Sequence, residues 1–240
     1  MRTSRAATGT PNIPGMTDPL ADSRTDYLAG ALADDAPPSP SALLGTWMQE
    51  ALDRHEQEGD LPDPTAAVLS TVALDADGSP RPRSRTVLVK GLGEDGDALT
   101  ATLYTNRDSA KGRELAAVPR AALLLPWYAL QRQVRIEGTV APLDDDASDA
   151  YFARRPRASQ LGAWASRQSA PIASRAELEA QLAEAAARFE GTDVPRPPFW
   201  GGYRITAERV EFWQGRSGRL HDRIAYTLGA GGWTRERLQP

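Results

Sequence analysis

The 240-residue chain contains no cysteine and only two histidines, His55 and His221. The absence of cysteine excludes disulfide bonds, thiolate metal sites, iron–sulfur clusters and cysteine nucleophiles. Two histidines are too few for a histidine-rich metal centre, so we expect no bound metal. No apolar run approaches the roughly 20 residues of a membrane-spanning helix. We therefore expect a soluble, cytoplasmic protein with no membrane partner.

The chain also has a small net charge and few lysines. The chain has 28 basic and 32 acidic residues, so its formal charge is −4, and the molecule as a whole does not attract nucleic acid or an acidic membrane. Lys90 and Lys111 are its only lysines; the other basic residues are arginine. G+C-rich coding explains this bias, and so does a role for both lysines that a planar guanidinium cannot fill.

The N-terminal region differs from the rest of the chain. Residues 1–22 lack apolar periodicity and are predicted to form a disordered arm, with Met16 as a second possible start. Their Arg, Ser and Thr bias is typical of a transit peptide, but no amphipathic face accompanies it. Residues 23–240 contain no linker after the Pro-rich segment 37–40 and are expected to form a single domain.

Apolar segments of strand character follow one another from Thr65 onward, with helices inserted between them. Leu43, Leu44, Trp47 and neighbouring residues share one face of a first helix. The expected strands are 66–75, 83–92, 98–105, 121–127, 133–140, 202–213, 223–228 and a last one around Trp233. The other expected helices are 109–118, one starting at 144–146, and 176–189. Because strands follow strands, we predict a mostly β protein with helices (α+β), an antiparallel barrel with peripheral helices.

Two motifs have simpler explanations than their functional ones. Gly91–Gly96 matches the dinucleotide fingerprint G-x-G-x-x-G, but the segment leads into a strand, and Glu94 and Asp95 would repel phosphates. A glycine-rich hairpin loop explains these residues. His55 has no second histidine four positions later, as a helical zinc motif requires, so we expect a surface histidine.

Three basic and polar clusters remain: 83–90, 151–169 and 219–223. A solvated charged face explains an isolated charge run, and arginines between aromatics can also grip nucleic acid. Three clusters in an acidic protein instead indicate pockets for a small phosphorylated ligand, because arginine binds phosphate through two hydrogen bonds. In the first cluster, strand alternation places Arg85 and Val87 on one face of the strand and Thr86 and Lys90 on the other.

Eight short motifs occur in order along the chain and together resemble one family, the FMN-dependent pyridoxine/pyridoxamine 5′-phosphate oxidases. The resemblance runs from about Arg24 to Pro240. The motifs are Arg85–Lys90, Tyr104–Asn106, Pro126–Val134, Tyr151–Gln160, Gln168–Ser169, Phe199–Gly202, Glu211–Gly215 and Arg219–Arg223.

The resemblance implies a split β-barrel homodimer with FMN at the subunit interface. It implies oxidation of pyridoxine 5′-phosphate or pyridoxamine 5′-phosphate to pyridoxal 5′-phosphate in vitamin B6 metabolism. Hydride would pass to flavin N5 and O₂ would be reduced to hydrogen peroxide, with ammonia released from the amine. Nucleic acid is not an expected partner.

The resemblance also implies roles for individual residues. Arg219 and His221 are the candidate catalytic residues, facing the pyridine ring. The candidate FMN residues are Arg85, Thr86, Val87, Leu88, Val89, Lys90, Tyr104, Thr105, Lys111, Gln133, Gln168, Ser169, Trp213 and Arg223. The candidate substrate residues are Arg24, Tyr27, Lys90, Tyr151, Arg155, Ser159, Arg219, Leu220 and His221.

One position departs from the family pattern. Ala110 precedes Lys111 where the family commonly has arginine, so one FMN phosphate contact is expected to be missing and FMN binding to be weaker. Arg107 is a candidate substitute. Two rival functions stay open: a split-barrel flavin reductase or oxidase acting on another substrate, and a non-catalytic module that binds flavin or pyridoxal phosphate.

Overall fold

The computed structural model describes residues 26–240, so the predicted disordered arm and Arg24 lie outside the described residues. The described part contains a nine-stranded antiparallel sheet and helices. The strands are β1 (Ala66–Leu74), β2 (Pro80–Leu88), β3 (Gly91–Asp95), β4 (Ala98–Asn106), β5 (Arg120–Trp127), β6 (Arg132–Pro142), β7 (Trp200–Gln214), β8 (Asp222–Gly229) and β9 (Gly232–Leu238). The α-helices are α2 (Pro40–Gln57), α3 (Ala110–Ala117), α4 (Asp145–Ala153), α5 (Arg157–Ala165) and α6 (Arg175–Arg188).

The long strand β7 joins the two ends of the sheet. The strand order is β2-β1-β5-β6-β7-β4-β3, and β8 and β9 continue from β7. The first half of β7 pairs with β4 and its second half with β8, while β6 pairs along most of its length. A register shift opposite Glu137/Gly138 of β6 leaves Glu208 of β7 without a partner and marks the change of partner, and a Cβ at Gly138 would overlap the carbonyl oxygen of Thr206. This bulge lets the sheet bend into a barrel.

The main core lies inside the curved sheet and is closed by α2. Its fully buried members include Leu69, Leu123, Ile136 and Phe212, which alternate with more exposed residues along their strands. Trp47 of α2 packs edge-on against Phe212, with ring centroids 5.2 Å apart. Burial of these side chains is the main stabilising contribution to the barrel.

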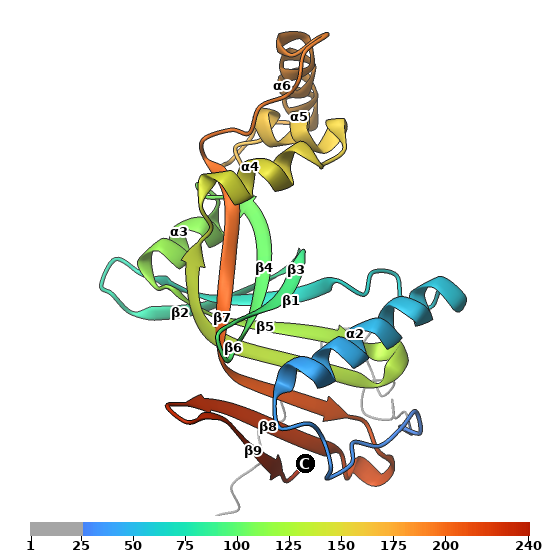
Figure 1. Ribbon diagram of the computed structural model, residues 1–240. Helices are drawn as coiled ribbons and strands as arrows, with labels where there is room; N and C mark the ends of the chain where they lie inside the picture. The colour runs from blue at the N-terminus through green and yellow to red at the C-terminus, as the bar shows by residue number, and fades with distance from the viewer. Residues whose placement is uncertain (1–25) are drawn as a thin grey trace, which may run out of the picture.

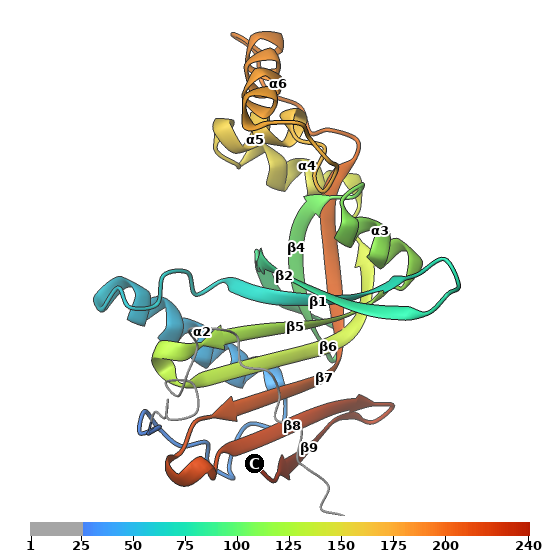
Figure 2. The same cartoon turned by 180° about the vertical axis from the view of Figure 1, so that it is seen from behind.

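The helices α4, α5 and α6 lie together at the end of the sheet where β4 ends and β7 begins (Figure 1). α4 starts with Asp144 as its N-cap, and the Asp144 carboxylate accepts a hydrogen bond from the backbone N–H of Ala147 at 2.7 Å. A second small core of Phe152, Phe189 and Trp200 lies beneath these helices. The view from behind shows β8 and β9 at the opposite end (Figure 2).

The predicted fold class is confirmed, and the expected strands and helices are found within a few residues of their predicted bounds. One predicted strand, 83–92, is wrong as a single element, because β2 ends at Leu88 and β3 begins at Gly91. The backbone N–H of Val89 donates to Thr65 and that of Lys90 donates to Thr102. At these two residues the chain passes from β2, which pairs with β1, to β3, which pairs with β4. Lys90 therefore lies where the chain crosses between the two strand pairs.

Two further details differ from expectation. Gly91–Asp95 forms β3, antiparallel to β4, and Gly96, at φ +59°, makes the turn together with Asp97. Gly91 and Gly93 therefore lie in a strand rather than in a loop, and the segment leads into a strand as predicted. Helix α5 was not predicted. Among the described residues, no helix is long and apolar enough to cross a membrane, and no group of metal-ligating side chains occurs.

Candidate functional site

A cavity of about 710 Å³ lies where β2, β4, the start of α3, and helices α4 and α5 meet. This volume is typical of a site for a cofactor together with a small substrate. Many of the candidate cofactor and substrate residues line the cavity. These are Thr86, Val87, Leu88, Lys90, Tyr104, Thr105, Lys111, Tyr151, Arg155, Ser159 and Gln168.

Lys111 places a buried ammonium group at one end of this cavity. It is the second residue of α3, which Ser109 caps by accepting a hydrogen bond from Gly112. Its Nζ lies 3.2 Å from Thr105 Oγ1 and 3.0 Å from Gln168 Oε1. Burial lowers the pKa of Lys111, the Arg85 guanidinium lowers it further, and Glu114 opposes the shift. No carboxylate among residues 26–240 lies within ion-pair distance of Nζ, so an anion can complete its coordination.

Arg85 lies beside the cavity rather than in its lining. Its Nη2 donates to Glu114 Oε2 at 2.6 Å, and its Nη1 donates to Thr71 Oγ1. Burial acts to raise the pKa of Glu114, but hydrogen bonds from Thr71 and Arg85 hold it below the usual value. Glu114 was not predicted as a site residue. The sequence of a short amphipathic helix does not show whether its glutamate side chain is exposed or buried.

Two further candidates lie outside the cavity lining. Ser169 has a left-handed backbone at φ 73°, and its hydroxyl accepts a hydrogen bond from the backbone N–H of Ala110 at 3.1 Å. It faces a neighbouring cavity of about 620 Å³ between α5 and α6. The guanidinium of Arg107, the candidate substitute for the missing arginine, packs over Gly201, donates to the Leu143 carbonyl at 3.3 Å and pairs with Asp145 at 3.7 Å.

Three parallel aromatic rings form one wall of the cavity. Tyr104 stacks on Tyr151 with centroids 3.8 Å apart and planes 7° apart, and Trp200 lies parallel to both. The guanidinium of Arg155 lies 4.6 Å above the Trp200 ring. Burial lowers the pKa of Arg155, and the charge of Tyr151 opposes that shift. Sequence reasoning gave Trp200 no role, although the adjacent glycines of its motif indicated a close approach.

Arg155 also carries an unsatisfied donor. Its Nη1 is buried and has no hydrogen-bond partner among the described residues. Leaving a buried charged donor unpaired is costly, so the atom is suited to an acceptor that enters the cavity. Four cationic side chains line the cavity, those of Lys90, Lys111, Arg154 and Arg155. Two of them, Lys111 and Arg155, place buried nitrogen atoms there that have no anionic partner among the described residues, so each is prepared for an anion.

The third predicted cluster lies elsewhere. His221 packs on Trp213 with centroids 4.6 Å apart, and Tyr27 meets both rings edge-on. The backbone N–H of Arg216 donates to His221 Nδ1 at 3.1 Å, so the neutral ring carries its proton on Nε2. Burial lowers the pKa of His221, and the Arg219 guanidinium lowers it further.

The remaining candidates surround this aromatic group. Arg219 has a left-handed backbone at φ 64°, and Leu220 beside it is 73% exposed. Arg223 donates from Nε to the buried Glu211 at 2.9 Å, which fixes its guanidinium on the sheet. Gln133 of β6 lies opposite Trp213 in the β6–β7 register.

The structure does not bring the two groups of residues together within one chain. The cavity lies at the α3–α5 end, and the Arg219–His221 loop follows the far end of β7 (Figures 1 and 2). The cavity lining contains no residue of that loop.

Residues 54–189 match the family described as pyridoxamine 5′-phosphate oxidase, and residues 200–240 match the pyridoxine 5′-phosphate oxidase C-terminal dimerisation region. A protein from Rubrobacter xylanophilus named pyridoxine/pyridoxamine 5′-phosphate oxidase is 53% identical over 222 residues, which cover 92% of this chain and 96% of that protein. The chain belongs to this family. A Nocardioides protein of the same name is 50% identical over 92% of the chain and 98% of its own length.

Solved structures agree with this assignment. PhzG from Burkholderia lata, in complex with tetrahydrophenazine-1-carboxylic acid, has a TM-score of 0.75 and 33% identity over 86% of this chain and 95% of its own. A pyridoxamine 5′-phosphate oxidase-related, FMN-binding protein from Nostoc punctiforme has a TM-score of 0.60 and 19% identity over 81% of this chain and 96% of its own, which shows the shared fold alone. Members of the family are flavoproteins that use FMN, and the buried Lys111 with its hydroxyl and amide neighbours fits the phosphate of that cofactor.

Proposed function

We propose that the chain oxidises pyridoxine 5′-phosphate or pyridoxamine 5′-phosphate to pyridoxal 5′-phosphate with FMN as cofactor. The observation that carries the proposal is the pair of prepared cationic groups in one cavity. Lys111 suits the phosphate of FMN, and the unpaired Nη1 of Arg155 suits the phosphate of the substrate. A ligand with a single anionic group would leave one of them unsatisfied.

The cofactor would be held by residues of the sheet, of α3 and of the segment after α5. Lys111, Thr105 and Gln168 would bind its phosphate, and Arg85 would add charge from beside the cavity. Residues Thr86 to Lys90 would follow the ring system, because the end of β2 and Lys90 after it line the cavity. When bound, FMN would supply the acceptor for the hydride, and O₂ would reoxidise the reduced flavin.

The substrate would be oriented by its phosphate. Tyr151 belongs to α4, Ser159 to α5 and Arg155 to the turn between the two helices. All three line the same cavity as Lys90. Holding the phosphate there fixes the position of C4′, which is catalysis by orientation. In the balanced reaction, pyridoxine phosphate and O₂ give pyridoxal phosphate and H₂O₂. The amine consumes one water in addition and releases ammonia.

A second copy of the chain would complete each site. The dimerisation region, residues 200–240, contains Trp213, Arg219, His221 and Arg223, which one chain leaves far from the cavity. In the homodimer the loop of one protomer would face the cavity of its partner. His221 would act as a donor through Nε2, because Nδ1 already accepts the Arg216 N–H. Arg219 would stabilise negative charge on the substrate ring.

The PhzG likeness favours one specific alternative, oxidation of a tricyclic carboxylic acid. That ligand carries a carboxylate and no phosphate ester. The Arg155 guanidinium lies against the Trp200 ring, and the Tyr151 and Ser159 hydroxyls line the same cavity. Together they offer several hydrogen-bond donors to one compact anion, which suits a phosphate better than a carboxylate.

The test is the visible spectrum of FMN-loaded protein under anaerobic conditions. Addition of pyridoxine 5′-phosphate should bleach the flavin band, and air should restore it with release of peroxide. An unchanged spectrum with both phosphorylated vitamers, and bleaching by the tetrahydrophenazine acid instead, would reassign the substrate. A flavin band that no substrate bleaches would leave a non-catalytic flavin-binding module.

A further inference from the structure

Residues 26–37, which we call the strap, cross the end of the sheet before α2 begins and contain no helix or strand. In Figure 1 the strap lies beside β8 and the loop that follows β7. Its course is fixed by polar contacts with distant residues. They begin at Ala29, whose backbone N–H donates to Gln131 Oε1 at 3.0 Å, and end at Pro37, whose carbonyl accepts a hydrogen bond from Tyr226 at 2.8 Å. From Gly30 onward the partners lie more than 180 positions away in the sequence.

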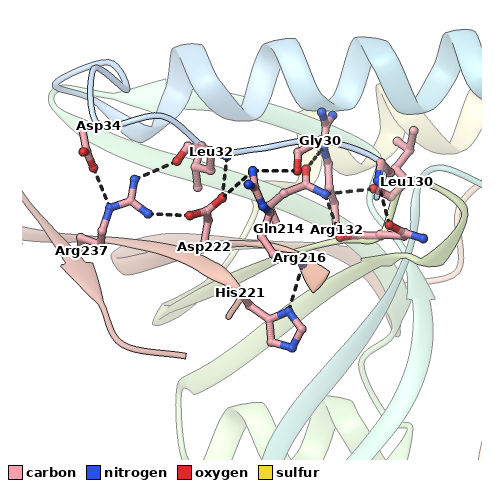
Figure 3. A network of polar contacts seen from close by, with 12 residues as sticks. Gly30, Leu32, Asp34, Leu130, Arg132, Gln214, Arg216, His221, Asp222 and Arg237 are labelled. Carbon is pink, nitrogen blue, oxygen red and sulfur yellow. Dashed lines mark hydrogen bonds and ion pairs between the residues drawn. The ribbon is translucent and has the colours of Figure 1, made fainter. Parts of the chain in front are cut away.

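Arg237 of β9 makes two of these contacts and also pairs with Asp222 of β8 (Figure 3). Its Nη2 donates to the Leu32 carbonyl at 2.8 Å, its Nη1 pairs with Asp222 at 2.9 Å, and its Nε pairs with Asp34 at 2.6 Å. The Asp34 carboxylate is 89% exposed, whereas the Asp222 carboxylate is 22% exposed. Solvent screening weakens the first pair much more than the second, so the Asp222 and Leu32 contacts hold the strap.

Asp222 and Arg216 connect the strap directly to His221. Asp222 Oδ2 accepts a hydrogen bond from the backbone N–H of Leu32 at 3.1 Å. The Arg216 side chain donates to the Gly30 carbonyl at 3.3 Å, while its own backbone N–H holds His221 Nδ1. One residue therefore binds the strap and sets the orientation of the imidazole.

Tyr27 is placed by the same arrangement. Its ring meets His221 edge-on at 5.5 Å and Trp213 at 5.7 Å. A Cβ at Gly215 would lie 2.8 Å from Tyr27 Cγ, so the ring occupies space that only glycine leaves free. The strap must stay close to β7 and β8 for Tyr27 to reach this space.

We propose that Arg237 and Asp222 form a latch that positions Tyr27 on His221 and thereby sets the affinity of the site for its substrate. Both are positioning residues, because they act through the strap and through Arg216. The link to substrate affinity rests on the proposed function, whereas the latch itself does not.

The test compares FMN-loaded wild type with Arg237→Ala by amide hydrogen exchange and by steady-state kinetics with pyridoxine 5′-phosphate. Loss of the latch should speed exchange in peptides covering residues 27–36 by about tenfold. It should raise KM by about tenfold, leave kcat within about twofold and leave FMN affinity unchanged. Asp222→Asn should have an effect of the same sign, and Gly215→Ala should raise KM by displacing Tyr27 while Arg237 is intact.

Two matched variants serve as controls. Arg235→Ala removes an exposed arginine from the same strand that makes no ion pair among the described residues. Asp34→Ala removes the screened partner of Arg237. Both should behave as wild type.

Each outcome decides one part of the proposal. Unchanged exchange in Arg237→Ala overturns the latch. Faster exchange with an unchanged KM overturns its role in substrate affinity. If wild type oxidises neither vitamer, the proposed function and this substrate role fall together, while the exchange experiment still decides the latch.

Discussion

At the cavity end, Lys111 and Arg85 are held by side chains of β1, β4 and α3, whereas at the loop end Arg219 and His221 depend on a left-handed turn and on the strap. The first group is preorganised by regular elements and by the buried carboxylate of Glu114. The second is assembled from segments that carry few buried apolar contacts. Loss of a group at the cavity end should therefore affect binding, and loss at the loop end should affect turnover or positioning.

The largest expected effect is on cofactor affinity. Lys111→Ala removes the buried cation and should raise the Kd for FMN by about 100-fold. Fluorescence quenching of FMN measures this Kd. Arg113→Ala, on the exposed side of the same helix, is the control and should leave it unchanged. Equal affinity in the Lys111 variant and wild type would place the phosphate elsewhere.

A smaller effect, on substrate affinity alone, separates the two cationic groups of the cavity. Arg155→Ala should raise KM for pyridoxine 5′-phosphate by about 30-fold, because the lost contact is charge-assisted. FMN content should be unchanged, since Lys111 is intact. Steady-state kinetics together with flavin absorbance test both statements, and an unchanged KM would contradict the role of Arg155.

At the loop end, the change should appear in turnover. Arg219→Ala should lower kcat by about tenfold, because in the proposed site its guanidinium faces the reacting substrate, and should leave the FMN content unchanged. The comparison between the two ends fails if kcat and FMN content fall by the same factor.

The smallest expected effect is on pH dependence. Burial and Arg219 both lower the pKa of His221 below its ordinary value of 6.5, so the neutral ring is the major form at that pH. Protonation at Nδ1 would break the bond from the Arg216 N–H, so kcat/KM should fall as pH decreases, with the midpoint of the decline below pH 6.5. His221→Gln should remove this decline, and His55→Gln should not. A midpoint above pH 6.5 in wild type contradicts the neutral donor.

Much of the fold could be predicted because the strands carry clear period-2 alternation and the turns carry glycine or aspartate. The break between β2 and β3 could not, because alternation continues through it and the break depends on which strands pair with Val89 and Lys90. Helix α5 was not predicted, because its first residues follow Pro156 and belong to the arginine-rich cluster, which we interpreted as a ligand-binding segment.

The candidate site shows the same limit. The family resemblance identified Lys111, Tyr151 and Arg155, which the structure brings into one cavity. Glu114 was missed because burial of a carboxylate depends on tertiary contacts with Thr71 and Arg85. The separation of the motifs into two ends was also beyond sequence reasoning, because it follows from the length and bend of β7.

The proposed site needs both ends of the chain and therefore two protomers. The direct measurement is the activity of a purified mixed dimer in which one chain carries Lys111→Ala and the other Arg219→Ala, assayed at an FMN concentration that saturates wild type but leaves the Lys111→Ala parent largely without cofactor. Each dimer would contain one site with both substitutions and one with neither, so its activity should be about half that of wild type. Activity no higher than the mean of the two parent variants would show that each site is built within a single chain and would contradict the account.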